Sequence, residues 1–140
     1  MRHTTRLVLA SLPLLVVACG QGPAATFVST FDEIAEDVCD CYEVAGFPTR
    51  QSCIDEVTPE VFDEDQVECI DERYGEVASE ADPTFNCQLR AARSVRDCIQ
   101  PHRSMCNLAG FQSCFETLQV SIEACPEFPE SVAIHFASCF

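Results

Sequence analysis

Hydrophobic positions recur every three or four residues along most of this chain, which is the period of a helix with one buried face. On a helical wheel of residues 31–45, acidic residues fill one arc, and the opposite arc holds Phe31, Ile34, Val38, Cys41, Tyr42 and Ala45. Thr30 and Glu33 have the spacing of a capping box, and Gly46 and Pro48 are residue types that follow the ends of helices. We therefore predict a first helix that starts at Thr30 and ends before Gly46.

Helix start signals place two further helices in the first half of the chain. Thr49 is positioned to cap a short second helix that runs to Val57. The tripeptide Thr58-Pro59-Glu60 has the order of an N-cap, a first helical residue and an acid in the first turn, so a third helix is expected to begin there. The apolar stripe of this third helix consists of Val67, Ile70, Tyr74 and Val77.

Three more helices are predicted in the second half. Asp82-Pro83 starts a fourth, which continues to about Gln100, because proline is favoured in a first turn. A fifth covers residues 105–124, and Pro129 opens a last short helix that reaches Phe140. The apolar stripe of the fifth helix consists of Leu108, Phe111, Phe115, Leu118 and Ile122.

No alternation typical of strands persists long enough to compete with this helical period. The predicted fold class is all-α, a small disulfide-stapled bundle of about five to six helices. Loops of a few residues favour antiparallel neighbours in such a bundle.

The N-terminal segment combines two arginines with a short apolar run. Arg2 and Arg6 precede the run, no acidic residue accompanies them, and the run extends from Leu7 to Ala18. Crossing a bilayer as a helix takes about 20 residues, so the run is too short to span a membrane. A positively charged start followed by roughly 7 to 15 apolar residues is typical of a secretory signal peptide.

The end of this run, Val16-Val17-Ala18-Cys19, resembles the lipobox of bacterial lipoproteins. The resemblance covers about the first twenty residues of the chain. It implies that the Cys19 thiol receives a diacylglycerol, that the chain is cut before Cys19, and that the new amine is acylated, which anchors the protein to a membrane. The residue after Cys19 is Gly20 and not an aspartate, and in this respect the sequence resembles lipoproteins that are passed on to the outer membrane. A conventional signal peptide whose cleavage site adjoins a cysteine is the alternative.

The predicted organisation therefore has three parts. Residues 1–18 are the lipoprotein signal peptide, residues 19–26 are the lipidated cysteine and a short tether, and residues 27–140 are one cysteine-rich helical domain. The predicted location is the cell envelope, reached through the secretory pathway, with the outer membrane as the membrane that holds the anchor.

The charge of the processed chain excludes one class of partner. Residues 1–18 hold two of the eight basic residues and none of the 23 acidic ones, so the remainder carries six bases against 23 acids, a formal net charge of −17. Such a surface repels phosphates, which argues against nucleic acid as a partner. The charge is also uneven, because 18 of the acids lie within residues 19–82.

Cysteine content points to a disulfide framework. The chain has 11 cysteines, and setting aside the lipidated Cys19 leaves an even number. An even, dense set in an exported chain indicates disulfides, here five of them. The predicted disulfide cysteines are Cys39, Cys41, Cys53, Cys69, Cys87, Cys98, Cys106, Cys114, Cys125 and Cys139.

Spacing predicts two of the five pairs. Cys87 and Cys98 are eleven residues apart, as are Cys114 and Cys125, and this is very nearly three helical turns. Each pair thus lies on one face of its helix, and an antiparallel arrangement would join Cys87 to Cys125 and Cys98 to Cys114. The geometry is similar to the twin-cysteine hairpins of coiled-coil-helix-coiled-coil-helix proteins, although their spacing is usually one residue shorter.

Two segments of the sequence resemble metal-binding patterns. Cys39-Asp40-Cys41 could supply thiolates to copper or zinc. Within a helix, however, these cysteines point about 200 degrees apart and are expected to bridge to different elements. Residues 63–74 superficially suggest a calcium loop, but glutamate replaces the glycine needed at the sixth position and tyrosine the glutamate needed at the twelfth.

Catalytic motifs are not recognisable, and no cofactor is implied. The chain lacks the G-x-S-x-G, H-E-x-x-H and glycine-rich phosphate patterns. His102 and His135 are interpreted as surface or core-edge residues. Arg96 falls within the apolar arc of the fourth helix, and we favour its pairing with an acid of the first half over binding of a ligand.

The sequence thus favours a lipid-anchored envelope protein that acts by contact, as a structural or protein-interaction module. Its expected partners are the membrane, through the lipid on Cys19, and an envelope protein or cationic group that meets the acidic first half. Two alternatives stay open. One is a small-ligand receptor or enzyme that uses Arg96 with acidic residues, and the other is an extracytoplasmic metal-binding protein.

Overall fold

The computed structural model describes residues 21–58 and 62–140. Within these ranges the chain is all-α, as predicted, and contains no strand. The predicted signal peptide, Cys19 and the Pro59-Glu60 pair lie outside the described residues. The elements are α1 (Pro23–Cys39), α2 (Arg50–Val57), α3 (Glu64–Arg103), α4 (Leu108–Glu123), α5 (Glu130–Phe136) and a final 3-10 turn (Ala137–Cys139).

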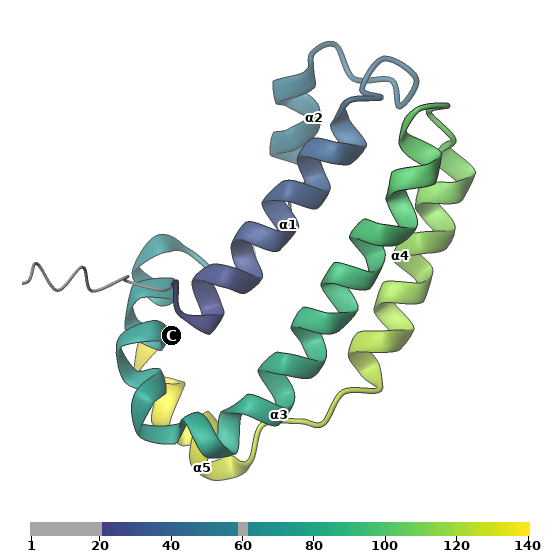
Figure 1. Ribbon diagram of the computed structural model, residues 1–140. Helices are drawn as coiled ribbons and strands as arrows, with labels where there is room; N and C mark the ends of the chain where they lie inside the picture. Colours follow the sequence, from purple (N-terminus) through teal and green to yellow (C-terminus); the bar gives the residue numbers. More distant parts are fainter. Residues whose placement is uncertain (1–20, 59–61) are drawn as a thin grey trace, which may run out of the picture.

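The long helix α3 organises the molecule (Figure 1). α1 and α4 both pack on its C-terminal half, α2 packs on α1, and α5 packs on the N-terminal half of α3. None of the helices in the described ranges combines the length and the apolar character that a membrane span requires.

The core consists of two clusters that lie along α3. The bundle cluster, defined by its largest side chains, joins α1, α3 and α4 through Phe27, Phe31, Ile34, Val38, Val95, Ile99, Phe111 and Leu118. The end cluster joins the N-terminal half of α3 to α5 and the start of α1 through Ala24, Ile70, Ala81, Phe85, Val132 and Phe136. Phe62 packs against both clusters, so it links the two parts of the core.

The prediction that a new helix starts at Asp82-Pro83 is wrong. α3 continues through Pro83, and the expected third and fourth helices are one helix of 40 residues. Proline removes one backbone hydrogen bond and bends the axis, and Figure 1 shows α3 curving through this region. Pro83 and Ser79, whose carbonyl loses its partner, are both exposed, so water can satisfy that carbonyl. Buried Ala81 and Phe85 hold the helix to the core on both sides of the proline.

The predicted start of the first helix is also wrong. α1 begins at Pro23, so residues 23–26 form its first turn and are not part of a tether. Gly22 is the N-cap and has no side chain to bond the backbone. The Asp71 carboxylate on α3 takes that role, accepting hydrogen bonds from the backbone nitrogens of Ala24 at 2.9 Å and Ala25 at 3.0 Å.

Thr30 consequently lies inside α1 and does not cap it. Its side chain is buried, and its hydroxyl donates a hydrogen bond to the carbonyl of Thr26 at 2.8 Å. α1 also ends earlier than predicted, at Cys39, and residues 40–46 form turns. Gly46 has a φ of 86° in these turns, a conformation that favours glycine.

The second helix is as predicted, and the third starts later. Thr49 caps α2, and its side chain and that of Ser52 form a capping box. Thr58 is the C-cap of α2 and not an N-cap. α3 is capped instead by Asp63, whose carboxylate accepts a hydrogen bond from the backbone nitrogen of Gln66 at 2.8 Å.

Five disulfides pair all ten cysteines of the described residues. Cys87–Cys125 and Cys98–Cys114 staple α3 to the α4 side of the bundle, and these are the two pairs that the eleven-residue spacing predicts. The other three pairs are Cys39–Cys53, Cys41–Cys106 and Cys69–Cys139. Cys39 and Cys41 therefore bridge to different elements, as their positions on a helix indicated.

Candidate functional site

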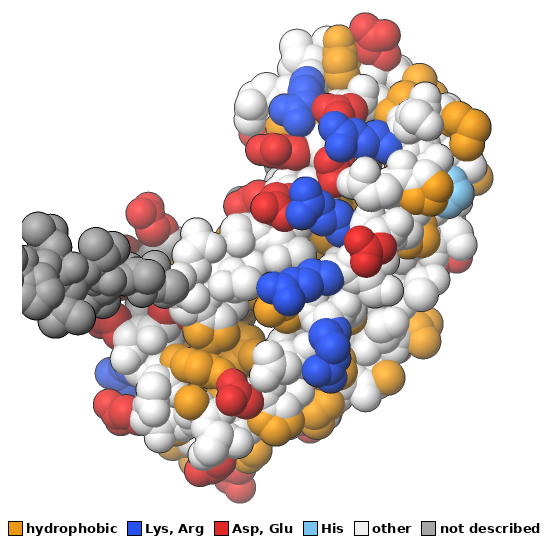
Figure 2. Space-filling view, in the orientation of Figure 1, with side chains coloured by type: hydrophobic (Ala, Val, Ile, Leu, Met, Phe, Trp, Pro, Cys, Tyr) orange, Lys and Arg blue, Asp and Glu red, His pale blue; other side chains and the backbone are white. Residues whose placement is uncertain are grey.

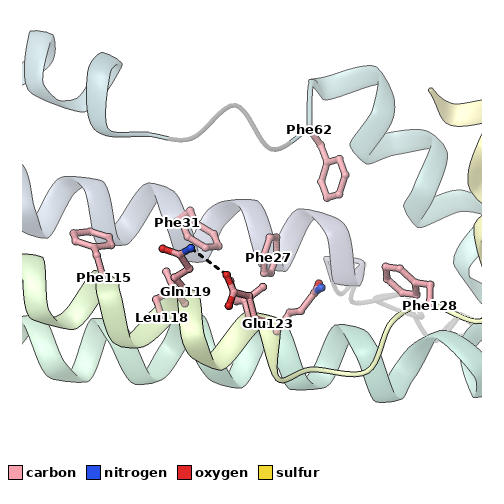
Figure 3. A pocket seen from close by; sticks show the side chains of 10 residues that line it. Phe27, Phe31, Phe62, Phe115, Leu118, Gln119, Glu123 and Phe128 are labelled. Carbon is pink, nitrogen blue, oxygen red and sulfur yellow. Dashed lines mark hydrogen bonds between the residues drawn. The ribbon is translucent and has the colours of Figure 1, made fainter.

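An apolar groove of about 550 Å³ lies between α1 and α4 (Figure 3). Both helices pack on α3, and the side chains that face each other across the remaining space line the groove. The lining consists of Phe27, Phe31, Phe62, Gln88, Phe115, Leu118, Gln119, Ile122, Glu123 and Phe128. Five of these ten residues are phenylalanines, so the walls are largely aromatic.

Local helix geometry explains how α1 and α4 contribute. Phe27 and Phe31 are four residues apart, so they lie on one face of α1, and their rings meet edge to face with centroids 4.9 Å apart. Phe115, Leu118 and Ile122 share one face of α4 for the same reason. The sequence pattern predicted the α4 stripe, and its buried member Leu118 forms part of the floor.

Two aromatic residues outside these helices close the end of the groove near the start of α1. Phe62 precedes α3, and Phe128 belongs to the connection between α4 and α5 (Figure 3). Phe128 is held in the end cluster by Phe85, with ring centroids 4.9 Å apart. No periodicity marks these residues, so sequence reasoning missed their part in the site.

The polar groups of the groove are few. Among the described residues that line it, Glu123 is the only charged one, and the Gln119 amide donates a hydrogen bond to the Glu123 carboxylate at 3.0 Å. Gln88 of α3 adds a second amide. Small-molecule sites typically have volumes of roughly 300 to 1,000 Å³, apolar walls and a few polar groups. The groove therefore has the size and chemistry to bind an apolar group.

The groove extends along α1. A second cavity of about 260 Å³ is lined by Phe31, Ile34, Ala35, Val57 and Phe115, so it shares two phenylalanines with the first. Val57 is the last residue of α2, which brings this helix to the edge of the second cavity.

Arg96 lies outside these cavities and takes part in an ion-pair network between α1 and α3. It pairs with Glu33 and with Asp37, the latter at 3.3 Å, which confirms the predicted pairing with acids of the first half. The side chain of Asp37 is 9% exposed and also accepts hydrogen bonds from Gln100 at 2.9 Å and from Arg103 at 2.6 Å. The ion pairs of Arg96 therefore join α3 to α1.

Asp40 continues this network toward α2. Its carboxylate pairs with Arg103 and, at 3.1 Å, with Arg50. Burial alone would raise the pKa of Asp40, but hydrogen bonds from Arg103 and Arg50 and their positive charges outweigh it, so this pKa lies below the ordinary 3.8. The same contacts, led by the hydrogen bond with Asp40, raise the pKa of Arg103. Figure 2 shows arginines in a row beside acidic side chains on this face.

The two histidines of the described residues have structural partners. His102 lies against Gly110, its Nδ1 is 3.2 Å from the Asn107 amide, and it lies near Cys98 and Cys114. The two sulfurs are bonded to each other, so this cluster offers no thiolate to a metal. His135 Nε2 is 3.2 Å from the backbone carbonyl of Arg73.

The remaining metal candidates are also used structurally. Cys39 and Cys41 are both in disulfides. Residues 64–74 are helical within α3, where Asp63 caps the helix and Asp71 caps α1, so this segment does not form a calcium loop.

The chain matches no protein-family model, no curated protein and no solved structure.

Proposed function

We propose that this protein is an exported, lipid-anchored protein of the bacterial cell envelope, and that its helical domain is a non-catalytic binding module. The groove between α1 and α4 is its binding site for an apolar group. The observation that carries the proposal is the groove itself, with about 550 Å³ of space and five phenylalanines in its walls.

The anchor is supported by the sequence around Cys19. A charged start, a twelve-residue apolar run and the lipobox-like Val16-Val17-Ala18-Cys19 follow one another in the order that lipoprotein processing requires. The five disulfides fit an extracytoplasmic location. α1 begins at Pro23, so the helical domain would follow the lipid after three residues and lie close to the membrane surface.

Binding is favoured over catalysis by the chemistry of the groove. A catalytic nucleophile needs a base within hydrogen-bond reach. The groove residues of the described ranges supply one carboxylate and two amides, and the carboxylate is hydrogen bonded to one of those amides. Arg96, the residue proposed for an enzyme or receptor, is held in ion pairs between α1 and α3.

An intact mass of the membrane-extracted protein tests the anchor. We expect a chain that begins at Cys19, carries the mass of a diacylglycerol and an acyl group, and gains ten alkyl groups only after reduction. The Cys19→Ser variant is expected to lack the mass of the diacylglycerol, because it has no thiol to receive it. A native chain that begins elsewhere, or that has free thiols before reduction, contradicts the proposal.

Binding of Nile red, an uncharged apolar dye, tests the groove. The Cys19→Ser protein is expected to bind the dye and enhance its fluorescence. Ile122→Glu places a charge among the lining residues and is expected to weaken binding at least tenfold. Val120→Glu is the matched control, because Val120 lies two residues away on α4, is 66% exposed and does not line the groove.

Circular dichroism shows whether these variants keep their helices. If Ile122→Glu loses helicity, Gln119→Glu replaces it, because Gln119 is exposed at the rim of the same groove. Equal dye binding by the groove variant and by Val120→Glu would exclude the groove as the site.

A second function, contact with a cationic partner, is favoured by the charge of α1. Asp32 and Glu36 are exposed on this helix and lie outside the ion pairs that join it to α3. We expect an envelope partner held by these acids to dissociate as salt rises. The double variant Asp32→Asn, Glu36→Gln is expected to reduce its capture, and an unchanged yield counts against this function.

A further inference from the structure

We infer that the groove between α1 and α4 takes up one acyl chain of the lipid that the protein carries on Cys19. The inference deepens the proposed function and rests on it, because it requires the lipidation of Cys19. In this inference the group that occupies the groove is part of the same molecule.

The distance along the chain from Cys19 to the groove is short. Pro23 is four positions after Cys19, with three residues between them, and these four steps span at most about 14 Å of extended chain. Phe27 lines the groove and lies about 6 Å farther along α1, from the rise of a helix. The end of the groove nearest the start of α1 is the aromatic end formed by Phe27, Phe62 and Phe128 (Figure 3). A lipid on Cys19 is therefore attached near this end.

Charge selects this acyl chain over a free fatty acid. Within the part of the chain that the structure describes, the only charged residue that lines the groove is Glu123, an acid, and the processed chain has a formal net charge of −17. A fatty acid would bring a second carboxylate into this negative field without a cation to pair with. The acyl chains of the anchor are joined through neutral ester or amide groups, so they bring no such charge.

The tether also compensates for competition from the bilayer. Moving an acyl chain from hydrocarbon to an apolar groove changes its hydrophobic free energy little, because both surroundings are apolar. Linkage to Cys19 gives the chain an effective concentration on the order of millimolar at the groove. Two chains anchor a protein stably and one does not, so a three-chain anchor can place one chain in the groove and keep two in the membrane.

Photo-crosslinking of the anchor tests this inference on the full lipoprotein. Cells are grown with a fatty acid that carries a diazirine, and an intact mass first establishes that the labelled chain is attached to Cys19. After illumination we expect peptides of α1 or α4 to be joined to the Cys19 peptide of the same molecule. Val120→Glu is expected to keep this crosslink, and Ile122→Glu is expected to reduce it at least tenfold. Gln119→Glu serves as the second groove variant if Ile122→Glu does not fold.

The outcomes separate the two proposals. An absence of lipid on Cys19 overturns the proposed anchoring and the inference with it. A lipidated protein whose chain crosslinks only to phospholipids or other proteins leaves the anchor intact and overturns the inference. Phospholipid adducts on the groove peptides would show that a bilayer lipid occupies the groove, and they would likewise overturn the inference.

A last arm compares the tethered chain with a free one. The Cys19→Ser protein is illuminated with diazirine-labelled palmitate, and we expect little labelling of α1 and α4. Glu123→Gln in the same background is expected to increase that labelling, because it removes the charge from the groove. Labelling of the Cys19→Ser protein as strong as that by the tethered chain would make the groove a fatty-acid site and refute the inference.

Discussion

The N-terminus of α1 depends on a carboxylate that belongs to α3, and this dependence can be measured. Asp71 accepts hydrogen bonds from the backbone nitrogens of Ala24 and Ala25. Losing an N-cap side chain costs about 0.5 to 2 kcal/mol, so we expect Asp71→Ala to lower the free energy of unfolding by roughly 1 to 2 kcal/mol. Glu72→Ala, at the next and exposed position, should change it by less than about 0.5 kcal/mol.

Gly22 should act through the same contact. A Cβ atom at position 22 would lie 2.1 Å from Cγ of Asp71, so Gly22→Ala forces the carboxylate away and removes the cap. We expect this variant to lose a similar free energy of roughly 1 to 2 kcal/mol. In the Asp71→Ala background no carboxylate remains to be displaced, and Gly22→Ala should then cost almost nothing.

A double-mutant cycle measures this coupling. Urea unfolding of the Cys19→Ser protein is followed by circular dichroism with the disulfides intact, for the parent, both single variants and the double variant. The expected double variant is about as stable as either single one. Additive losses would refute the reasoning, because they would mean that Gly22 and Asp71 stabilise α1 independently.

Three further variants probe particular contacts. Gly110→Ala would place a Cβ 2.4 Å from Nδ1 of His102, and we expect a loss of about 1 to 3 kcal/mol in urea unfolding. Gly75→Ala meets no atom within 4 Å in the described structure and should stabilise α3 by about 0.5 to 1 kcal/mol; destabilisation there would show that α3 is strained at this point. The lowered pKa of Asp40 means that its stabilising contribution is present above about pH 4 and is lost as the pH falls through the folded-state value. The difference between the unfolding midpoints of the parent and Asp40→Asn should therefore be largest at pH 7 and shrink as the pH falls below about 4, and a difference that stays constant in acid would contradict this.

Local periodicity accounts for what the sequence predicted well. The apolar stripes of α3 and α4 repeat at helical spacing, and their buried members Ile70, Phe111 and Leu118 all lie in the core. The eleven-residue spacing of Cys87 and Cys98 on one helix also anticipated the pairs they form with α4 and its end. These features depend on residues within a few helical turns of one another, so they can be predicted from the sequence alone.

The candidate site was predicted only in part. The apolar stripe of the fifth helix predicted that Phe115 and Ile122 share one face, but it did not predict a groove beside them. In the structure they are partly buried and line the groove, because α1 and α4 both pack on α3 and leave space between them. Arg96 was correctly expected to pair with acids of the first half.

The sequence by itself determined the helical class, the faces of the helices and two of the five disulfide pairs, because each follows from spacing along the chain. The tertiary structure alone decided where α1 begins. Its cap is the carboxylate of Asp71, which accepts a hydrogen bond from the backbone nitrogen of Ala24, 47 residues away along the chain. Packing on both sides of Pro83 kept α3 continuous where local preference favoured a new start. The groove is likewise a product of how three helices pack, because its walls come from residues as distant as Phe27 and Phe128.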